Sequence, residues 1–114
     1  MSSARLPAGL EAAAIRRSVE ALGGHAMVLH KGDPDRGQLI LLVGERGAHR
    51  AILERALQRG GNYHWTRRES AQTPDPATLA KFIGERTRFD PDLWLIELDV
   101  PDAERFIAEM TAFG

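Results

Sequence analysis

The chain contains no cysteine, which excludes disulfide bonds, thiolate zinc sites, cysteine nucleophiles and iron–sulfur ligation. It has no long hydrophobic run either, because the longest uninterrupted one covers only residues 39–43 and cannot span a bilayer. Residues 1–7 lack the apolar segment that an export signal needs. We therefore expect a cytoplasmic protein that does not contact a membrane.

The familiar catalytic and nucleotide-binding motifs are missing as well. No serine lies in a Gly-x-Ser-x-Gly elbow, and no glycine pattern matches a Walker loop or a dinucleotide fingerprint. His49 and His64 could face each other across a hairpin, but two histidines without a third ligand are a weak zinc signal. These patterns predict no cofactor and no metal ion, and they favour a protein without catalytic activity.

What the chain does contain is typical of one globular domain. Of its 114 residues, 43% are hydrophobic and 27% are charged, which argues against disorder, and this length suffices to bury a core. We expect a single domain over residues 1–114.

The net charge of −1 hides an uneven distribution along the chain. Residues 1–68 carry 11 Lys and Arg against 6 Asp and Glu, a balance of +5, whereas residues 69–114 carry 4 against 10, a balance of −6. Such a split can mark a nucleic-acid surface, or a homodimer in which the halves pair head to tail. The alternative, which we favour, is that the two halves interleave in the fold and their fields largely cancel.

Hydrophobic periodicity predicts most of the secondary structure. Apolar residues at helical spacing predict an amphipathic helix over residues 8–22. The run at residues 38–43 has no polar face, so it should be a central strand that is covered on both sides. Asp75 followed by Pro76 indicates the start of another helix. Further strands are expected over residues 25–31, 62–69 and 93–98, and a last helix beginning at Pro101 carries apolar Ala103, Phe106, Ile107, Met110 and Phe113.

Residues 48–58 are ambiguous, because their apolar residues fit a helix whereas their short length and flanking glycines fit a hairpin strand. Periodicity alone leans towards a helix. In either case strands are grouped before the later helices, and the connections have hairpin length. We predict an α+β fold with a mostly antiparallel sheet of four or five strands that is packed by helices.

The tripeptide Asp-Pro-Asp occurs twice, at residues 33–35 and 90–92, each time before an apolar run. Proline presets the backbone of a turn and aspartate bonds to its own backbone, so we favour two turns that lead into strands. The alternative is that the four carboxylates meet and hold a divalent cation or a basic partner, which requires the strands at residues 38–43 and 93–98 to be adjacent and parallel. The candidate binding residues are Asp33, Asp35, Asp90 and Asp92.

A basic and aromatic stretch covers residues 46–68 and includes Tyr63 and Trp65. Arginines contact phosphates and exposed aromatic rings stack on bases, so this stretch is a candidate for nucleic-acid binding. The candidate residues are Arg50, Trp65, Arg67 and Arg68. We favour the alternative in which Tyr63 and Trp65 share a buried face and the arginines are solvated or paired with glutamates. The available glutamates are Glu45, Glu54 and Glu69.

Trp94 is the candidate for a protein-interaction surface. If its strand lies at the edge of the sheet, it could receive a partner protein or a second copy of the chain. The alternative is that Trp94 and Ile96 fill the core beneath the last helix.

Several short motifs occur in a fixed order along the chain. The most specific is Arg-Phe-Asp-Pro-Asp-Leu-Trp at residues 88–94, followed by Glu97. The supporting motifs are Arg5-Leu6, Ile15-Arg16-Arg17, Gly23-Gly24, Lys31-Gly32-Asp33, Gly37 and Trp65. Over nearly the whole chain, these motifs resemble a family of short alphaproteobacterial proteins known only as domain of unknown function 1491. The resemblance implies no activity, cofactor or catalytic residue.

The resemblance also implies a strand at residues 51–57, which resolves the ambiguous segment and gives the order α-β-β-β-β-α-β-α. The chain departs from the family pattern in two places. Gly9-Leu10-Glu11 stands where bulky apolar residues are usual, and Leu98-Asp99 stands where a second acidic pair is more common. The first departure bears on how the beginning of the first helix packs.

These observations predict a non-catalytic binding or regulatory protein whose partner is another protein or a second copy of the chain. Two alternatives stay open. One is a nucleic-acid-binding module that uses residues 46–68. The other is a small enzyme or divalent-metal protein that uses the two Asp-Pro-Asp turns.

Overall fold

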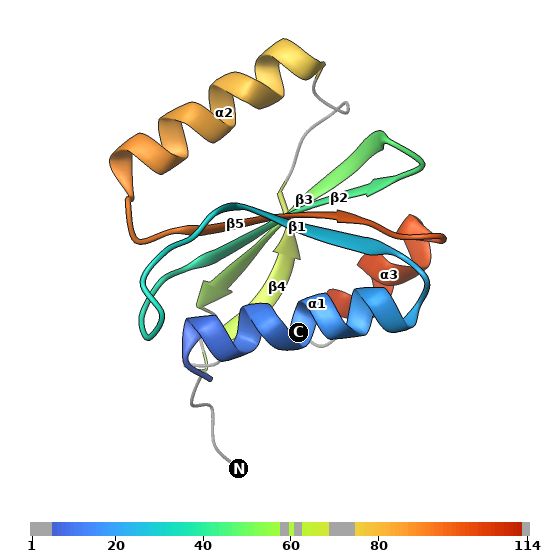
Figure 1. The fold of residues 1–114 in the computed structure, drawn as a ribbon, viewed down its shortest axis with the longest axis horizontal. Helices are drawn as coiled ribbons and strands as arrows, with labels where there is room; N and C mark the ends of the chain where they lie inside the picture. The colour runs from blue at the N-terminus through green and yellow to red at the C-terminus, as the bar shows by residue number, and fades with distance from the viewer. Residues whose placement is uncertain (1–5, 58–59, 61–62, 69–74, 113–114) are drawn as a thin grey trace.

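In the computed structural model, which describes residues 6–57, 60, 63–68 and 75–112, the chain forms one five-stranded sheet and three helices (Figure 1). The predicted element order is confirmed, with a strand rather than a helix at residues 48–57. The helices are α1 (Ala8–Ala21), α2 (Pro76–Phe89) and α3 (Ala103–Met110). The strands are β1 (His25–His30), β2 (Leu39–Glu45), β3 (Ala48–Leu57), β4 (Tyr63–Arg67) and β5 (Trp94–Asp99).

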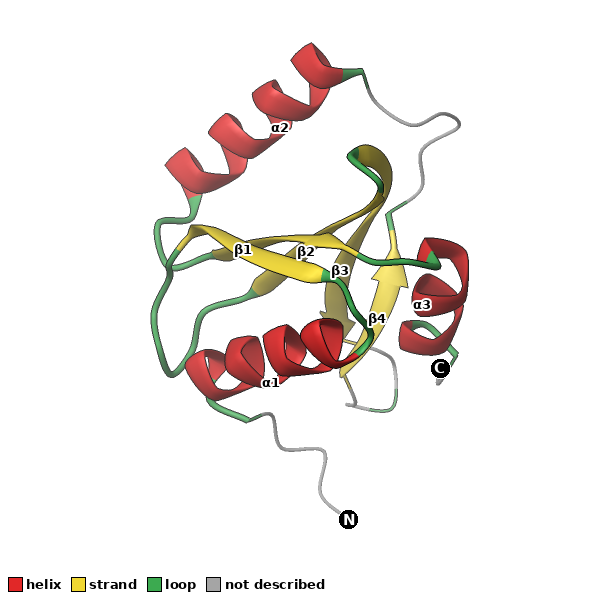
Figure 2. Cartoon of the chain, turned by 45° about the vertical axis from the view of Figure 1, so that its right-hand side comes forward, coloured by secondary structure: helices red, strands yellow, loops and turns green. Residues whose placement is uncertain are grey.

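Two helices cover one face of the sheet, and the third covers the other face (Figure 2). α1 and α3 pack on one face over the larger core, and α2 packs on the other face through Leu79, Phe82 and Ile83. β2 contributes to both cores because successive side chains of a strand point to opposite faces. Leu39, Leu41 and Val43 belong to the larger core, and Ile40 and Leu42 belong to the smaller one. The prediction that this strand is covered on both sides is confirmed.

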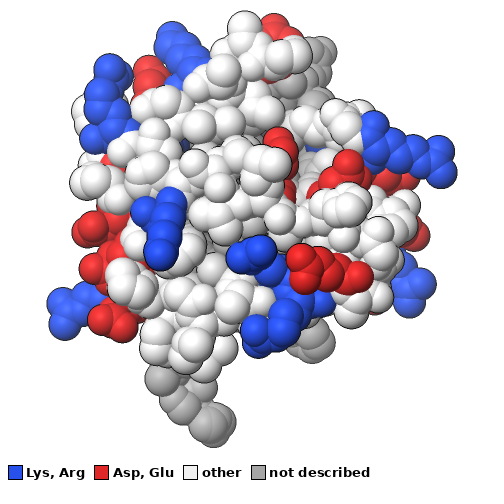
Figure 3. Space-filling model, in the orientation of Figure 1, with Lys and Arg blue, Asp and Glu red and all other residues white. Residues whose placement is uncertain are grey.

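The strands follow the order β1-β5-β2-β3-β4. β2 and β5 run parallel, and the other three pairs are antiparallel, so the sheet is mostly antiparallel as predicted. β5 comes from the acidic part of the chain and lies between two strands of the basic part. The two halves therefore interleave, and positive and negative side chains are interspersed on the face shown in Figure 3.

Short polar contacts fix where the helices begin. Oδ1 of Asp75 accepts a hydrogen bond from the backbone N–H of Thr78 at 2.7 Å, which confirms Asp75 as the N-cap of α2. At the start of α3, Oε1 of Glu45 accepts from the N–H of Ala103 at 3.0 Å. None of the helices within the described residues has both the length and the apolar character needed to cross a membrane.

The turn between β2 and β3 is held by a side chain from β5. Arg46 and Gly47 both have positive φ, 53° and 82°, which suits a tight hairpin turn. The two oxygens of Asp99 accept from the backbone N–H groups of this turn, from Arg46 at 3.0 Å and from Gly47 at 3.2 Å. Asp99 therefore has a structural role at this end of the sheet.

A few predicted features lie outside the described residues. These are Arg59, Asn62, Glu69, Phe113 and the side chain of Tyr63.

Candidate functional site

The two Asp-Pro-Asp turns lie side by side, because each leads into one strand of the parallel pair β2 and β5. The backbone N–H of Asp33 donates to the carbonyl of Asp92 at 3.0 Å. The indole Nε1 of Trp94 donates to the carbonyl of Asp33 at 2.7 Å. Gly37 is packed so closely that a Cβ there would lie 2.3 Å from the carbonyl oxygen of Asp92. The condition for a site shared between the turns, adjacent parallel strands, is therefore met.

The carboxylates of these turns nevertheless bind backbone groups rather than one another. Oδ1 of Asp33 accepts from the N–H groups of Arg36 and Asp35, both at 2.8 Å, and these bonds lower the pKa of Asp33. Oδ1 of Asp90 accepts from the N–H of Asp92 at 3.2 Å. Within the described part of the chain, no group of three or more His, Asp or Glu side chains is placed to hold a metal ion. The geometry supports the interpretation of these segments as turns.

Trp94 is a core residue, and its strand does not lie at an edge of the sheet, as an interaction surface there would require. β5 has a neighbouring strand on each side. The side chain of Trp94 is only 6% exposed and belongs to the larger core together with Ile96 and Phe106. The alternative, in which Trp94 and Ile96 fill the core, is confirmed, so Trp94 offers no surface to a partner.

The candidate nucleic-acid residues are divided between the two faces of the sheet. Arg67 lies 3.5 Å from Glu104 of α3. Arg68 pairs with Glu54 at 2.8 Å and lies 4.9 Å from the ring centroid of Phe82 on α2. Because α2 and α3 cover opposite faces, these two guanidinium groups do not form one basic surface.

Trp65 is not a free stacking platform. It is half-buried against the larger core, and the guanidinium of Arg55 lies 5.0 Å from its ring centroid. Arg50 is exposed. The expected pairing of arginines with nearby glutamates is confirmed for Glu54, whereas Glu45 binds the start of α3 instead.

The departure from the family pattern at Glu11 has a structural reason. Glu11 is buried on α1 and forms an ion pair with Arg55 of β3, whose side chain is only 14% exposed. The same guanidinium contacts the ring of Trp65. A charged residue can therefore occupy this core position because β3 supplies the opposite charge.

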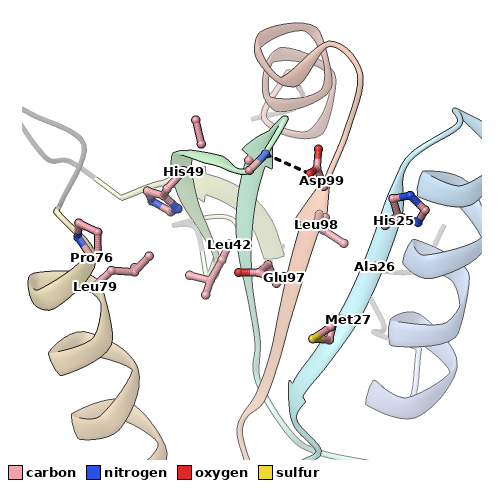
Figure 4. Close-up of a pocket in the computed structure, with 13 residues that line it drawn as sticks. His25, Ala26, Met27, Leu42, His49, Pro76, Leu79, Glu97, Leu98 and Asp99 are labelled. Carbon is pink, nitrogen blue, oxygen red and sulfur yellow. Dashed lines mark hydrogen bonds between the residues drawn. The ribbon is translucent and has the colours of Figure 1, made fainter.

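A groove of about 870 Å³ lies between α2 and the sheet (Figure 4). Leu79 of α2 and Leu42 of β2 line one side of it, and Met27 of β1 lines the other. No residue of α2 is buried, so this helix covers the sheet only in part and the groove continues towards β1. The lining is mostly apolar, and its ionisable members are His25, His49, Glu97 and Asp99.

The two carboxylates of the groove differ in what they bind. Both oxygens of Asp99 accept from the β2–β3 turn. Glu97 comes two residues before Asp99 in β5, and it lies directly opposite Met27 on one side and Leu42 on the other. Among the described residues the side chain of Glu97 forms no hydrogen bond and no ion pair, and it points into the groove (Figure 4). The charge of Glu97 is thus available to a ligand.

His49 is the second polar group of interest. It is half-buried, its Nε2 atom is buried without a hydrogen-bond partner, and burial lowers its pKa while the charge of Glu97 opposes this shift. His49 and His64, which could have faced each other across a hairpin, do not: His49 lies opposite Gly44 in β2, and His64 lies opposite Ala56.

None of the candidate binding residues named from the sequence lines this groove, but His49, which was weighed there as a weak zinc ligand, does. The sequence contains one signal that points to it. Glu97 is the only charged residue within residues 93–98, a stretch that is otherwise apolar. The other lining residues come from segments that only the strand order brings together.

A family model described as "Protein of unknown function (DUF1491)" matches residues 6–108. Among solved structures, the crystal structure of a DUF1491 family protein from Caulobacter crescentus CB15 is 27% identical, with a TM-score of 0.77 over 90% of this chain and 94% of that one. An NMR structure of a DUF1491 family protein from the same organism is also 27% identical, with a TM-score of 0.72 over 86% of this chain and 88% of that one.

The solution structure of protein Atu0922 from A. tumefaciens shares the fold, with 23% identity and a TM-score of 0.71 over 87% of this chain and 89% of that one. No curated protein matches the chain. The family resemblance that the motif at residues 88–94 indicates is confirmed by these matches.

Proposed function

Because this chain belongs to the DUF1491 family, whose description assigns no chemistry, we propose a function from the groove itself. The protein is a cytoplasmic, non-catalytic binding module, and its ligand carries a positive charge on an apolar body. The groove beside α2 is the binding site. Glu97 is the group that recognises the charge.

The observation that carries this proposal is the unpartnered carboxylate of Glu97. It stands on the face of a central strand between the apolar side chains of Met27 and Leu42. Glu97 is itself exposed, but a ligand that fills the apolar groove excludes water beside it, and the lower local dielectric then strengthens its attraction for a cation. The described residues that line the groove include no lysine or arginine, so they offer Glu97 no internal cation.

The shape and chemistry of the groove suit a small organic group or an amino-acid side chain. Its volume of about 870 Å³ lies within the range of about 300–1,000 Å³ that is usual for ligand sites. Leu42 and Leu79 provide apolar contact, while Glu97 and His49 provide a few polar groups that can fix orientation. Phosphate-bearing ligands such as nucleic acids are disfavoured, since the carboxylates would repel them.

The proposal of binding without catalysis is supported by the side chains that line the groove. Among the described residues that line it, none is a serine, threonine, tyrosine or lysine that could attack a substrate. A carboxylate and an imidazole are present, but both also serve as recognition groups for an amine or a guanidinium. The groove therefore supports binding more directly than chemistry.

The test uses small amines and matched acids as probes. Phenethylamine and hexylamine are titrated into the isotope-labelled protein, and 3-phenylpropionate and hexanoate are the anionic controls. We expect the amines, and not the acids, to shift the amide signals of Leu42 and Glu97. The Glu97→Gln variant should lose this response, whereas Glu20→Gln, an equal charge change at an exposed position of α1, should retain it. Amines that bind equally well to the Glu97→Gln variant, or to neither protein, would contradict the proposal.

A further inference from the structure

The groove opens towards β1, which is an edge strand of the sheet. Within the described residues, β1 has a strand neighbour on one side only, β5. Backbone N–H and C=O groups that point away from β5 are therefore left without a strand partner. His25, Ala26 and Met27 of this strand also line the groove, so the open edge and the groove form one continuous surface (Figure 4).

The edge at β1 lacks most of the devices that protect exposed strands from pairing. Natural proteins usually place lysine, proline or inward-pointing charges on such a strand. β1 reads His-Ala-Met-Val-Leu-His and contains none of them. A register shift between Val28 and His30 interrupts only its last part, so residues 25–28 form a regular ladder with β5.

The opposite edge of the sheet is different. β4 ends in Arg67, which is followed directly by Arg68, and both guanidinium groups are held in ion pairs with Glu104 and Glu54 respectively. Charged side chains of this kind discourage another strand from pairing. The contrast singles out β1 as the edge that is open to a new strand.

Apolar side chains on β1 face the same direction as the groove. Met27 is 60% exposed and Leu29 is 40% exposed, although both belong to a strand of the sheet. Met27 lies directly opposite Glu97 in the ladder between β1 and β5. An added strand would bury Met27 and bring its own side chains towards Glu97.

We propose that the ligand is an extended basic peptide, which pairs with β1 as a sixth strand and places a lysine or arginine side chain over Met27 onto Glu97. This inference rests on the proposed function and specifies its ligand. Main-chain hydrogen bonds to β1 would supply affinity, and the contact with Glu97 would supply specificity. The added strand would lie roughly 10 Å from β5, twice the usual strand spacing, a gap that a stretched arginine and the glutamate side chain bridge together.

Charge complementarity selects a basic peptide over a second copy of this chain. Among the described residues, the ionisable lining of the groove consists of two carboxylates and two histidines, without lysine or arginine. In a dimer formed through β1, residues 25–30 of the second copy would bring no lysine or arginine to Glu97, and Lys31 lies beyond the strand, after its irregular part. Only a partner with a cation at the right position on its strand satisfies both the edge and the carboxylate.

The test uses the synthetic peptide acetyl-Thr-Val-Arg-Val-Thr-amide with the full-length protein. One comparator replaces arginine by citrulline, which keeps the shape and removes the charge. Two further comparators carry N-methyl groups on alternate backbone amides, so that each blocks one edge of the peptide. Affinities are measured by NMR titration, and hydrogen exchange of the β1 amides is followed with and without peptide.

We expect the arginine peptide to bind about tenfold more tightly than the citrulline peptide, because a charge-assisted hydrogen bond is lost. This preference should disappear in Glu97→Gln and persist in Glu20→Gln. One N-methylated peptide should fail to bind while the other binds normally, since only one edge of an added strand faces β1. On binding, exchange should slow at every second amide of residues 25–28, the regular part of β1.

The outcomes separate this inference from the function on which it rests. If the amine probes bind through Glu97 but both N-methylated peptides bind as well as the parent, the edge pairing is wrong and the binding function stands. If neither amines nor peptides bind, both proposals fail. If native mass spectrometry shows a dimer whose β1 amides are already protected, a second copy occupies this edge and the peptide proposal is overturned.

Discussion

The ion pair between Glu11 of α1 and Arg55 of β3 allows a sharp test of the packing described above. Both side chains are largely buried, with exposed fractions of 10% and 14%. Replacing Glu11 by leucine puts an apolar side chain at this core position, but it removes the carboxylate that pairs with the guanidinium of Arg55. We therefore expect Glu11→Leu to destabilise the fold, despite being more hydrophobic.

The size of the effect follows from the burial of the pair. Removing one member of a buried ion pair costs about 3–5 kcal/mol, because the remaining charge loses the opposite charge that offset its burial. Arg55 keeps some exposure and its contact with the ring of Trp65, so we expect a loss near the lower value. With a urea m-value of about 2 kcal/mol/M, a loss of about 3 kcal/mol lowers the unfolding midpoint by about 1.5 M.

The assay is urea unfolding of the wild type and three variants, followed by circular dichroism. The double variant Glu11→Leu/Arg55→Met removes both charges and should recover most of the lost stability. The control is Glu104→Leu, which breaks the exposed pair with Arg67 and should cost less than about 1 kcal/mol. If Glu11→Leu costs no more than Glu104→Leu, or if the double variant is less stable than Glu11→Leu, the reasoning about this pair is refuted.

Two further predictions concern the turns and the groove. Gly37→Ala should lower the free energy of unfolding by roughly 1–3 kcal/mol, because the new Cβ would lie 2.3 Å from the carbonyl oxygen of Asp92. The control is Gly84→Ala, which should not lower the free energy of unfolding, because a Cβ at that position meets no atom within 4 Å. Urea unfolding of both variants checks this, and equal effects would contradict it. The pKa of His49 should lie below 6.5, and lower still in Glu97→Gln, in an NMR titration. Because the folded pKa is depressed, the contribution of His49 to stability is complete above pH 6.5 and is lost as the pH falls through the folded value. An unchanged or higher pKa of His49 in Glu97→Gln would contradict the interaction between the two side chains.

The elements that could be predicted from the sequence are those whose signals are local. Asp75 and Pro76 indicate a helix start by their own chemistry, and the apolar run at residues 38–43 indicates a strand that is buried on both faces. β3 could not be assigned from its periodicity alone, because its apolar residues fit both a helix and a strand. It is a strand because β2 and β4 pair with it on both sides, which is tertiary information.

Trp94 shows how a missing strand order leads to a wrong site. Residues 93–96 are as continuously apolar as residues 38–43, and this is the pattern of a central strand. The interaction hypothesis required this strand to lie at the edge of the sheet instead. In the structure the indole N–H is satisfied by the carbonyl of Asp33, so Trp94 can be buried without a polar cost.

The groove could not be predicted, because its residues come from four strands and α2. The distance along the chain between Met27 and Glu97 is 70 residues, yet the two face each other across adjacent strands. No local pattern encodes such a pairing. The isolated charge of Glu97 in an apolar strand was the one feature of the sequence that indicated the groove.

The insertion of β5 between β1 and β2 has a consequence for how the protein is made. β2, β3 and β4 follow one another and pair as hairpins, so this part of the sheet can form while the ribosome is still adding later residues. β1, although synthesised earlier, has no strand to pair with until residues 94–99 emerge. During translation the apolar side chains of β1 and of both cores therefore cannot be buried until nearly the whole chain has been synthesised. We expect stalled or truncated products that lack β5 to expose these surfaces and to be recognised by chaperones and proteases.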